Sequence, residues 1–249
     1  MKLKILSYNI HKGFDRGNKN YFLEEVKKLI EASGADIVFL QEVVGQSNKY
    51  KKKGLIDAQF EYLADSIWTH YSYARNAVYD HGHHGNLILS RFPIESWENV
   101  NITTNSLEKR GFLICKLSIP HKKNKHIHVA CAHLDLLHRG RKLQYQIIKK
   151  KILSLQIAEH EPMIIAGDFN DWNKKCTSVF EGDLGLKETY HLTHGRFAKT
   201  FPATFPVLTL DRIYVKNLKV LKSQIQRQKS KKHFSDHLPL FCELELSAD

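Results

Sequence analysis

The sequence has few cysteines and no long hydrophobic run. Its 249 residues include four cysteines, Cys115, Cys131, Cys176 and Cys242, and no two of them form a CxxC pair. A zinc ribbon is therefore unsupported, and three of the four lie inside apolar runs, which favours core thiols in a reducing compartment. No apolar run approaches the roughly 20 residues that a helix needs to cross a bilayer, so we expect no transmembrane segment.

Features of a signal peptide and of a domain linker are also missing. The first residues, MKLKILSYNIHKG, alternate apolar with polar side chains, and no cleavage site of small residues follows. We therefore interpret residues 3–9 as the first strand of the fold and expect a cytoplasmic protein. Because no linker rich in Pro, Ser or Gly and no internal repeat divides the chain, residues 1–249 are predicted to form a single domain.

Acidic residues are scarce relative to basic ones. There are 26 Asp and Glu against 38 Lys and Arg, which makes the net charge +12. This balance favours a polyanionic partner, either nucleic acid or an anionic membrane surface; a basic surface kept for solubility is the alternative. Each lysine-rich run alone suggests a solvated loop or helix face, but together they are able to attract phosphates. These runs span residues 49–53, 121–126, 149–151, 174–175 and 229–233.

Hydrophobic periodicity predicts strands that alternate with helices. Helices are expected where apolar residues recur at spacings of three and four, at residues 21–33, 57–68 and 138–160. Short apolar runs predict strands at residues 3–9, 36–42, 86–94, 111–119, 126–133, 163–167, 210–215 and 238–246. Helices between strands imply covered sheets, and successive strands imply antiparallel stretches. The pattern therefore predicts an α/β (α+β) fold with two sheets and helices outside.

Polar residues whose side chains are able to bind ligands or transfer protons recur where these apolar runs end. A turn would explain any one of them, because Asp and Asn hydrogen-bond to nearby backbone. Ligand sites in layered α/β structures, however, gather where strands end and loops begin, and a turn does not explain the whole set. The set comprises Asn9, Glu42, His133, Asp168, Asn170, Asp211, Asp236 and His237.

The chemistry of this set fits one task. Asn9, Glu42 and Asp236 offer the hard oxygen ligands that suit Mg²⁺ or Mn²⁺. The imidazoles of His133 and His237 are able to donate protons or hydrogen bonds near neutral pH. Two further side chains, two residues apart on a turn, are suited to hold an attacking water, and these are Asp168 and Asn170. A metal, imidazoles and a carboxylate that holds water together indicate a phosphodiester hydrolase.

The motifs also resemble a known family. LSYNIHKG, DIVFLQEV, HGNLILSRFPI, ACAHLD, IIAGDFND, LDRIYV and SDHLPL occur in the order seen in the endonuclease/exonuclease/phosphatase (DNase I-like) superfamily. The stretches RNAVYDHGHHGN, EKRG and HGRFAKTFP resemble small bacterial members often encoded near cardiolipin synthase genes. The resemblance covers residues 3–246. It implies a four-layered α/β/β/α sandwich of two mixed sheets with helices outside, and one Mg²⁺-dependent site.

Site residues follow from the resemblance position by position. It implies that Asn9, Glu42 and Asp236 belong to the metal site. Asp168 and Asn170 resemble the pair that positions water and phosphate, and His237 resembles the imidazole that Asp211 orients. His133 matches a histidine of DNase-like and sphingomyelinase-like members, where abasic-site nucleases usually carry Tyr. Phosphate contacts are expected from Arg110, His84 and Asn86, although Arg110 and His84 are also consistent with a surface arginine and a loop histidine.

The substrate is left open between three hypotheses. The net charge and the lysine runs favour a Mg²⁺-dependent nuclease that hydrolyses phosphodiesters of nucleic acid without sequence specificity. The alternative is a phosphodiesterase or phosphatase that acts on a phospholipid or small phosphoester. A non-catalytic nucleic-acid-binding module ranks lowest, because none of the eight site residues is lost. No obligate protein partner is evident in the sequence.

Overall fold

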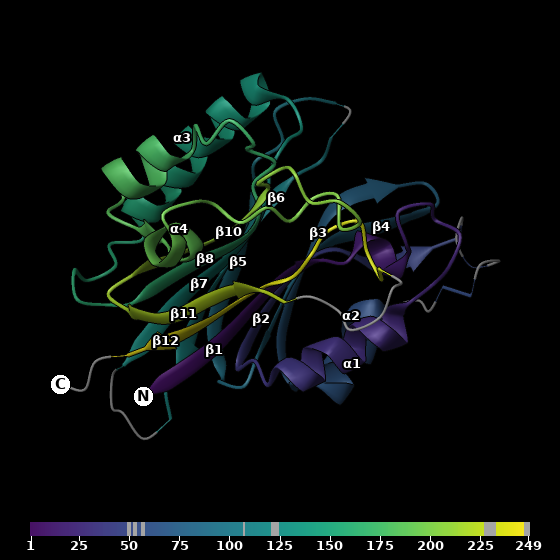
Figure 1. The fold of residues 1–249 in the computed structure, drawn as a ribbon, viewed down its shortest axis with the longest axis horizontal. Helices are drawn as coiled ribbons and strands as arrows, with labels where there is room; N and C mark the ends of the chain where they lie inside the picture. The colour runs from purple at the N-terminus through teal and green to yellow at the C-terminus, as the bar shows by residue number, and fades with distance from the viewer. Residues whose placement is uncertain are drawn as a thin grey trace.

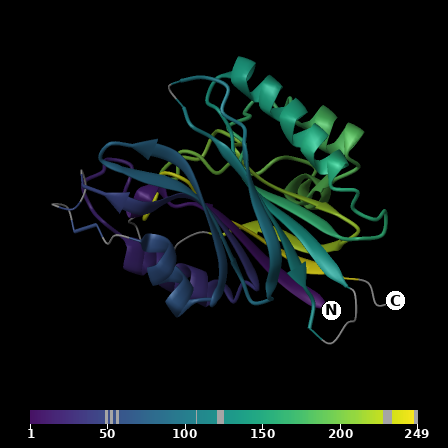
Figure 2. The same cartoon turned by 180° about the vertical axis from the view of Figure 1, so that it is seen from behind.

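The protein is a sandwich of two packed sheets covered by helices on both outer faces (Figure 1). The computed structural model describes residues 1–48, 51, 54–55, 58–106, 108–120, 125–226 and 233–246. Seen from behind, the two sheets remain packed face to face, with a pair of helices outside one and a long helix outside the other (Figure 2). This arrangement confirms the predicted four-layered fold.

The first sheet contains both the first and the last strand of the described chain. Its order is β11-β12-β1-β2-β4-β3, in which β1 and β2 are parallel and the other neighbours are antiparallel. The strands are β1 (Lys2–Asn9), β2 (Ile37–Ser47), β3 (His70–Tyr79), β4 (Gly82–Ser90), β11 (Lys219–Ile225) and β12 (Leu240–Glu245). The sheet is therefore mixed, as predicted.

The second sheet comes from the middle of the chain. Its order is β5-β6-β7-β8-β10-β9, and β7 and β8 form its parallel pair. The strands are β5 (Ile94–Asn101), β6 (Gly111–Ser118), β7 (His126–His133), β8 (Met163–Asp168), β9 (Lys187–Glu188) and β10 (Asp211–Lys216). Each sheet thus has six strands and one parallel pair among antiparallel neighbours.

Helices cover the outer faces through their apolar sides. Against the first sheet lie α1 (Leu23–Ser33) and α2 (Gln59–Ser66), while α3 (His138–Ser154) covers the second. The short helix α4 (Thr189–His194) packs against β10 and β11, where the sheets meet. Two short helical segments are also present in the described residues, η1 (His11–Gly13) after β1 and η3 (Ser178–Asp183) before β9. No helix in the described ranges is long and apolar enough to span a membrane.

Strand alternation decides which residues reach the space between the sheets. On β8, Ile164 and Ala166 belong to the core between the sheets, whereas Met163 and Ile165 pack under α3. Successive side chains of a strand point to opposite faces, so Asp168 continues the inward series. By the same parity, β1 and β7 each end in an inward polar residue, Asn9 and His133, and the antiparallel β10 begins with one, Asp211.

Most of the predicted strands are confirmed, with three kinds of difference. Residues 86–94 are not one strand, because β4 ends at Ser90 and β5 begins at Ile94 beyond Pro93. Strands β3, β5, β9 and β11 were not predicted, since their outward residues are polar and their apolar runs are short. The long helix ends at Ser154 rather than at 160. All four cysteines are buried and free of disulfides, as predicted for Cys115, Cys131 and Cys242.

Candidate active site

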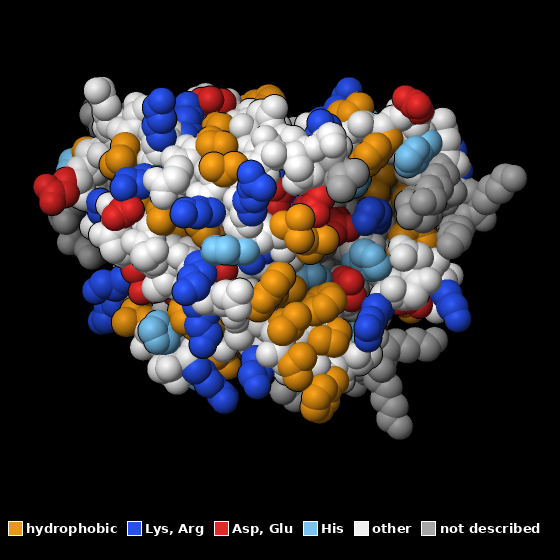
Figure 3. Space-filling view, turned by 90° about the horizontal axis from the view of Figure 1, so that it is seen from above, with side chains coloured by type: hydrophobic (Ala, Val, Ile, Leu, Met, Phe, Trp, Pro, Cys, Tyr) orange, Lys and Arg blue, Asp and Glu red, His pale blue; other side chains and the backbone are white. Residues whose placement is uncertain are grey.

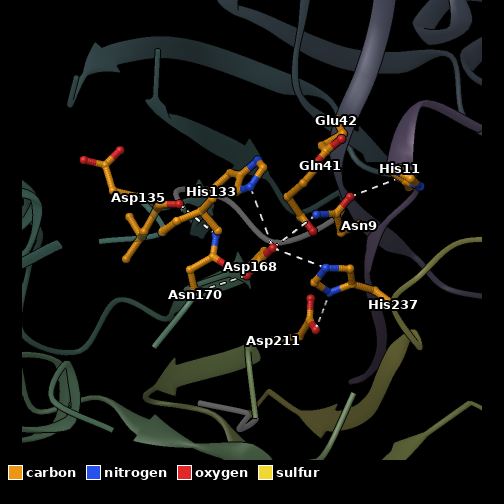
Figure 4. Close-up of polar contacts among 12 residues, drawn as sticks. Asn9, His11, Gln41, Glu42, His133, Asp135, Asp168, Asn170, Asp211 and His237 are labelled. Atoms are coloured by element: carbon orange, nitrogen blue, oxygen red, sulfur yellow. Dashed lines mark hydrogen bonds and ion pairs between the residues drawn. The ribbon is translucent and has the colours of Figure 1, made fainter. Parts of the chain in front are cut away.

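The inward residues at the strand ends meet at one place between the two sheets. Figure 4 shows Asn9, from the first sheet, beside Asp168, His133 and Asp211, from the second. Asn9 Nδ2 donates to Asp168 Oδ2 at 3.1 Å, so this contact joins the ends of β1 and β8 across the sandwich. The predicted strand-end set therefore converges because both sheets end their inward series at the same edge.

Asp168 lies at the centre of this cluster. Its Oδ2 lies 3.6 Å from Nε2 of His237 and 3.7 Å from Nε2 of His133, and its Oδ1 accepts a 2.9 Å bond from the backbone N–H of Asn170. Burial raises the pKa of Asp168 to about 6; His237⁺ opposes this shift and the nearby Asp211 carboxylate adds to it. A carboxylate with this pKa is able to accept a proton from water near neutral pH.

His237 is held by a second buried carboxylate. Its Nδ1 lies 2.9 Å from Asp211 Oδ2, the same oxygen that accepts from Thr200 Oγ1. Burial alone would lower the pKa of His237, but Asp211 and Asp168 outweigh it and raise the pKa to about 10. The imidazole is therefore protonated at neutral pH, with its Nε2 side turned toward Asp168. The predicted orienting role of Asp211 agrees with this geometry.

A β-bulge directs Glu42 into the same cleft. The register of β2 against β4 shifts between Leu40 and Val43, and Glu42 has a left-handed φ of 59°. Gln41 keeps the inward direction of the strand and donates to Cys131 Sγ, so the bulge is what turns the next residue. Burial acts to raise the pKa of Glu42, but Lys12, with which it forms an ion pair, and His133 hold that pKa well below its usual range.

Two groups of residues are candidates to hold a metal ion. Among the described His, Cys, Asp and Glu residues, the ligand atoms of Asp168, Asp211 and His237 lie within 4.8 Å of one another. The three predicted metal ligands each contact a different partner. Asn9 donates to Asp168, Glu42 pairs with Lys12, and Asp236 Oδ1 lies 3.7 Å from His11 Nδ1. Glu42 nevertheless fits a hard cation, because it is ionised and its oxygens reach the cleft.

Cationic and imidazole groups border the cluster on the side of Glu42. Arg110 is mostly buried and donates to Glu108 Oε2 at 3.0 Å, and its charge is close enough to lower the pKa of His133. Burial and the charge of Lys12 lower the pKa of His84 to about 4, so this ring is neutral at pH 7. The structure thus places Arg110 and His84 beside the site, and their contact with a phosphate stays a prediction.

Asn86 has a different place from the one expected. It is fully buried on β4, and its Nδ2 donates to the carbonyls of Gly111 and Cys131 at 3.0 and 3.2 Å. Those carbonyls belong to β6 and β7, so the amide joins the two sheets. A donor that is already shared between two carbonyls is not available to a phosphate, and this geometry supports a structural role.

Sequence reasoning missed the groups that hold the catalytic side chains in place. Ser235 Oγ donates to the carbonyl of Asn9 at 2.7 Å and accepts from the backbone N–H of His237, which ties β1 to the SDH motif. Lys12 pairs with Glu42. Gly167 has a φ of 144°, and a Cβ there would lie 2.0 Å from the Ala132 carbonyl oxygen. The signal was present, since these residues stand inside YNIHKG, SDHLPL and AGDFND.

The lysine-rich runs give a mixed result. On α3, Lys149 and Lys151 are paired with Asp183 and Glu98 at 2.8 and 2.7 Å, which reduces their field. Lys174 and Lys175 are exposed on the loop that follows Asn170. Most of the runs at 49–53, 121–126 and 229–233 lie outside the described residues.

Comparison with known proteins decides the family. The chain matches the Endonuclease/Exonuclease/phosphatase family over residues 6–237. The chain belongs to this family. It is 41% identical over 246 residues to YbhP of Escherichia coli (strain K12), an alignment that covers 98% of this chain and 96% of YbhP. Members of the family are hydrolases that act on phosphoester bonds and generally depend on a divalent metal.

Solved structures of the family share the fold at low sequence identity. The Bacteroides thetaiotaomicron VPI-5482 mannosyl-6-phosphatase Bt3783 matches with a TM-score of 0.75 and 17% identity, over 98% of this chain and 100% of that chain. The D. rerio TDP2 complexed with single strand DNA product matches with a TM-score of 0.71 and 18% identity, over 98% and 99%. These two proteins show that one sandwich serves different phosphoesters, so substrate has to be argued from the site.

Proposed function

We propose that the protein is a divalent-metal-dependent phosphodiester hydrolase whose first candidate substrate is nucleic acid. The observation that carries this proposal is the position of Asp168, whose two carboxylate oxygens meet Asn9, Asn170, His133 and His237 at the junction of both sheets. A buried carboxylate with a pKa of about 6, beside an imidazolium, is the pairing that water activation at a phosphorus atom needs.

The residues divide the reaction between them. Asp168 Oδ2 accepts a proton as the oxygen of water forms its bond to phosphorus and the P–O bond to the leaving group breaks. Nε2 of His237, kept protonated by Asp211, donates to the phosphoryl oxygen on which negative charge develops. Arg110 supplies further positive charge, which also acts on His133. Asn170 fixes the loop that carries these groups, since its Nδ2 donates to the Leu134 carbonyl at 2.9 Å.

A divalent cation fits the hard-oxygen donors of this site. Glu42, Asn9 and Asp236 would hold Mg²⁺ or Mn²⁺, which would supply Lewis-acid stabilisation of the phosphoryl oxygens when bound. The fit rests on Glu42, which is ionised, turned into the cleft by the bulge and only partly exposed. Asn9 Oδ1 accepts from the backbone N–H of His11 at 3.1 Å, which fixes the amide near the same cleft.

One parallel assay tests this function. Metal-stripped protein is supplied with Mg²⁺ or Mn²⁺ and offered plasmid DNA, RNA, 5′-tyrosyl DNA, a phospholipid and bis(4-nitrophenyl) phosphate. We expect hydrolysis of the small diester and of at least one nucleic acid, and no turnover in excess EDTA. Full activity of stripped protein in EDTA would contradict the metal assignment, and activity of Asp168→Asn equal to that of the natural chain would contradict the site.

A phospholipid headgroup ester is the second candidate. It is favoured by one specific observation, namely that exposed apolar side chains stand on the loops next to the catalytic residues. Hydrolysis of the phospholipid but of neither DNA nor RNA in the same assay would establish this candidate in place of the first.

A further inference from the structure

Three loops that leave the catalytic strand ends carry exposed apolar side chains. The loop after His133 exposes Leu136 and Leu137, the loop after Asn170 exposes Trp172, and the loop before Asp211 exposes Phe205 and Val207. Leu137 is 68% and Phe205 75% exposed, which is unusual for large apolar residues beside a polar site. We call these five residues the apolar rim. Figure 3 shows hydrophobic side chains gathered beside acidic and histidine side chains at the centre of one face.

Direct contacts join the three loops into one surface. The guanidinium of buried Arg141 lies 4.6 Å from the centre of the Trp172 ring and donates to the carbonyl of Leu136 at 2.5 Å. Lys174 Nζ lies 5.5 Å from the ring of Phe197, which connects the second loop to the third. The ring of Phe201 lies 5.0 Å from that of His237, so the third loop reaches the catalytic imidazole. The apolar rim therefore borders the site itself.

The three segments that carry these apolar residues contain basic side chains but no acidic ones. Residues 136–143, 172–175 and 196–207 contain no Asp or Glu. Their exposed basic side chains are Arg139, Lys142, Lys174, Lys175, Arg196 and Lys199. A chance mixture would include acids, since 26 of the 249 residues are acidic and many are on the surface. These three segments thus combine exposed apolar side chains with exposed basic ones.

We propose that the apolar rim and its basic residues dock the protein onto the surface of an anionic lipid bilayer. Leucine, phenylalanine and tryptophan beside lysine and arginine form the composition that inserts at the boundary between headgroups and acyl chains and attracts anionic lipid. Nucleic acid would use the same charges but would need flat aromatic faces, and three of the five rim residues are aliphatic. The bilayer is therefore the better fit.

Vesicle flotation tests the proposal with matched variants. Two kinds of vesicle are the probes. One consists of phosphatidylcholine with about one third of the anionic lipid phosphatidylglycerol, and the other consists of phosphatidylcholine alone. We expect the natural chain to float only with the anionic vesicles, and Leu137→Ser with Phe205→Ser to weaken partition at least about tenfold. The control is Trp97→Ser with Leu153→Ser, which removes apolar side chains of similar exposure on β5 and α3 and should change partition less than about twofold.

Tryptophan fluorescence provides a second readout. Anionic vesicles should shift the emission of the natural chain to shorter wavelength, and Trp172→Phe should abolish this shift while Trp97→Phe retains it. Failure to bind anionic vesicles, or equal losses in rim and control variants, would overturn the proposal. So would a shift of Trp172 emission by a single-stranded oligonucleotide alone, or self-association that the rim substitutions abolish.

The docking surface and the proposed hydrolysis are tested separately. The rim residues touch no reacting atom, so both serine variants should hydrolyse bis(4-nitrophenyl) phosphate at the natural rate in the absence of vesicles. A natural chain that hydrolyses this diester but does not float with anionic vesicles would refute the docking surface alone. Flotation of a chain without hydrolase activity would refute the proposed function alone.

Discussion

Two carboxylates at the site have pKa values displaced in opposite directions. Asp168 is buried beside a second carboxylate, Asp211, and its pKa is raised to about 6. Glu42 is paired with Lys12, and its pKa falls well below the usual range. Environments that separate the pKa values of neighbouring acids fit the two roles proposed for these carboxylates, a proton acceptor and a charged metal ligand. The proposed roles thus rest on what each carboxylate touches.

Substitution of the central residues should lower turnover more than affinity. Asp168→Asn and His237→Ala act on the attacking water and on the developing charge, so each should lower kcat by roughly 10²- to 10⁴-fold with little change in KM. Asp211→Asn should have a smaller effect in the same direction, since Asp211 acts through His237. Steady-state kinetics on the small diester measures this. Losses below about tenfold for both central variants would contradict their roles.

Glu188 gives a pH dependence to stability rather than to catalysis. It is buried at the start of α4 and accepts from the backbone N–H of His191, and burial raises its pKa to about 7. Because the folded pKa lies above the ordinary value, the folded state binds this proton more tightly than the unfolded state does. Its contribution to stability is fully present below about pH 4.5 and is lost as the pH rises through about 7.

Glu188→Gln should remove this dependence while keeping the acceptor for His191. At pH 8 we expect the variant to be more stable than the natural chain by about 1–3 kcal/mol, and at pH 4.5 the two should be nearly equal. Urea unfolding at both pH values measures the difference. A natural chain that is no less stable than the variant at pH 8 would show that Glu188 is accommodated as a carboxylate.

At the scale of elements, strand ends and one bulge build the site. Four strands deliver an inward residue by simple alternation, but β2 reaches the cleft only because its bulge turns Glu42. Local geometry also explains Gly167, which precedes Asp168. Its φ is 144°, and a Cβ at this position would lie 2.0 Å from the Ala132 carbonyl oxygen, so a side chain is excluded. Backbone geometry within these elements therefore sets the positions of the acids.

Gly167→Ala should displace the end of β8. The added Cβ meets a backbone carbonyl that has no room to move, so we expect a loss of about 1–3 kcal/mol in stability, together with lower kcat. Gly182→Ala in η3 is the matched control, because a Cβ there meets nothing within 4 Å. Thermal unfolding and diester hydrolysis are measured on both. Equal behaviour of the two variants would mean that β8 accommodates the methyl group.

The elements also show what sequence reasoning is able to predict. The apolar run at residues 126–133 predicted β7, and the position of Asp168 and His133 at strand ends predicted that they gather at one site. The sequence pattern did not predict that the Asn86 amide donates to the carbonyls of Gly111 and Cys131, because these hydrogen bonds depend on which strands of the opposite sheet pass beneath β4. Pairings between distant strands are not encoded in local pattern, and neither Lys12 with Glu42 nor Ser235 with Asn9 was foreseen.

For the molecule as a whole, the excess of positive charge is unevenly distributed. Lys149 and Lys151 of α3 are paired with acids, whereas residues 136–143, 172–175 and 196–207 expose basic side chains and contain no acid. An anionic partner would thus be drawn toward the cleft rather than toward the molecule in general. The net charge of +12 predicts attraction to polyanions, and the structure adds a direction to it.

Nucleic-acid binding should therefore depend on salt and on the site loops. The logarithm of the binding constant should fall with the logarithm of salt concentration, by about 0.9 per phosphate contact on duplex and about 0.7 on single strands. Lys174→Glu with Lys175→Glu should flatten this slope, whereas Lys28→Glu on α1, where the lysine pairs with Glu24, should leave it unchanged. Fluorescence anisotropy measures both. Dissociation constants no tighter than roughly 10⁻⁴ M for DNA and RNA would remove the support for a nuclease.

The pairing of β1 with β12 has a consequence for folding during synthesis. Lys2 lies opposite Glu245 in the middle of the first sheet, and His237 stands just before β12. A chain emerging from the ribosome is able to pair β1 with β2 early, but one edge of β1 stays open until β12 has been made. The imidazole that faces Asp168 is added only shortly before β12. A partly made copy that ends before residue 237 thus exposes one edge of β1 and lacks the imidazole that faces Asp168.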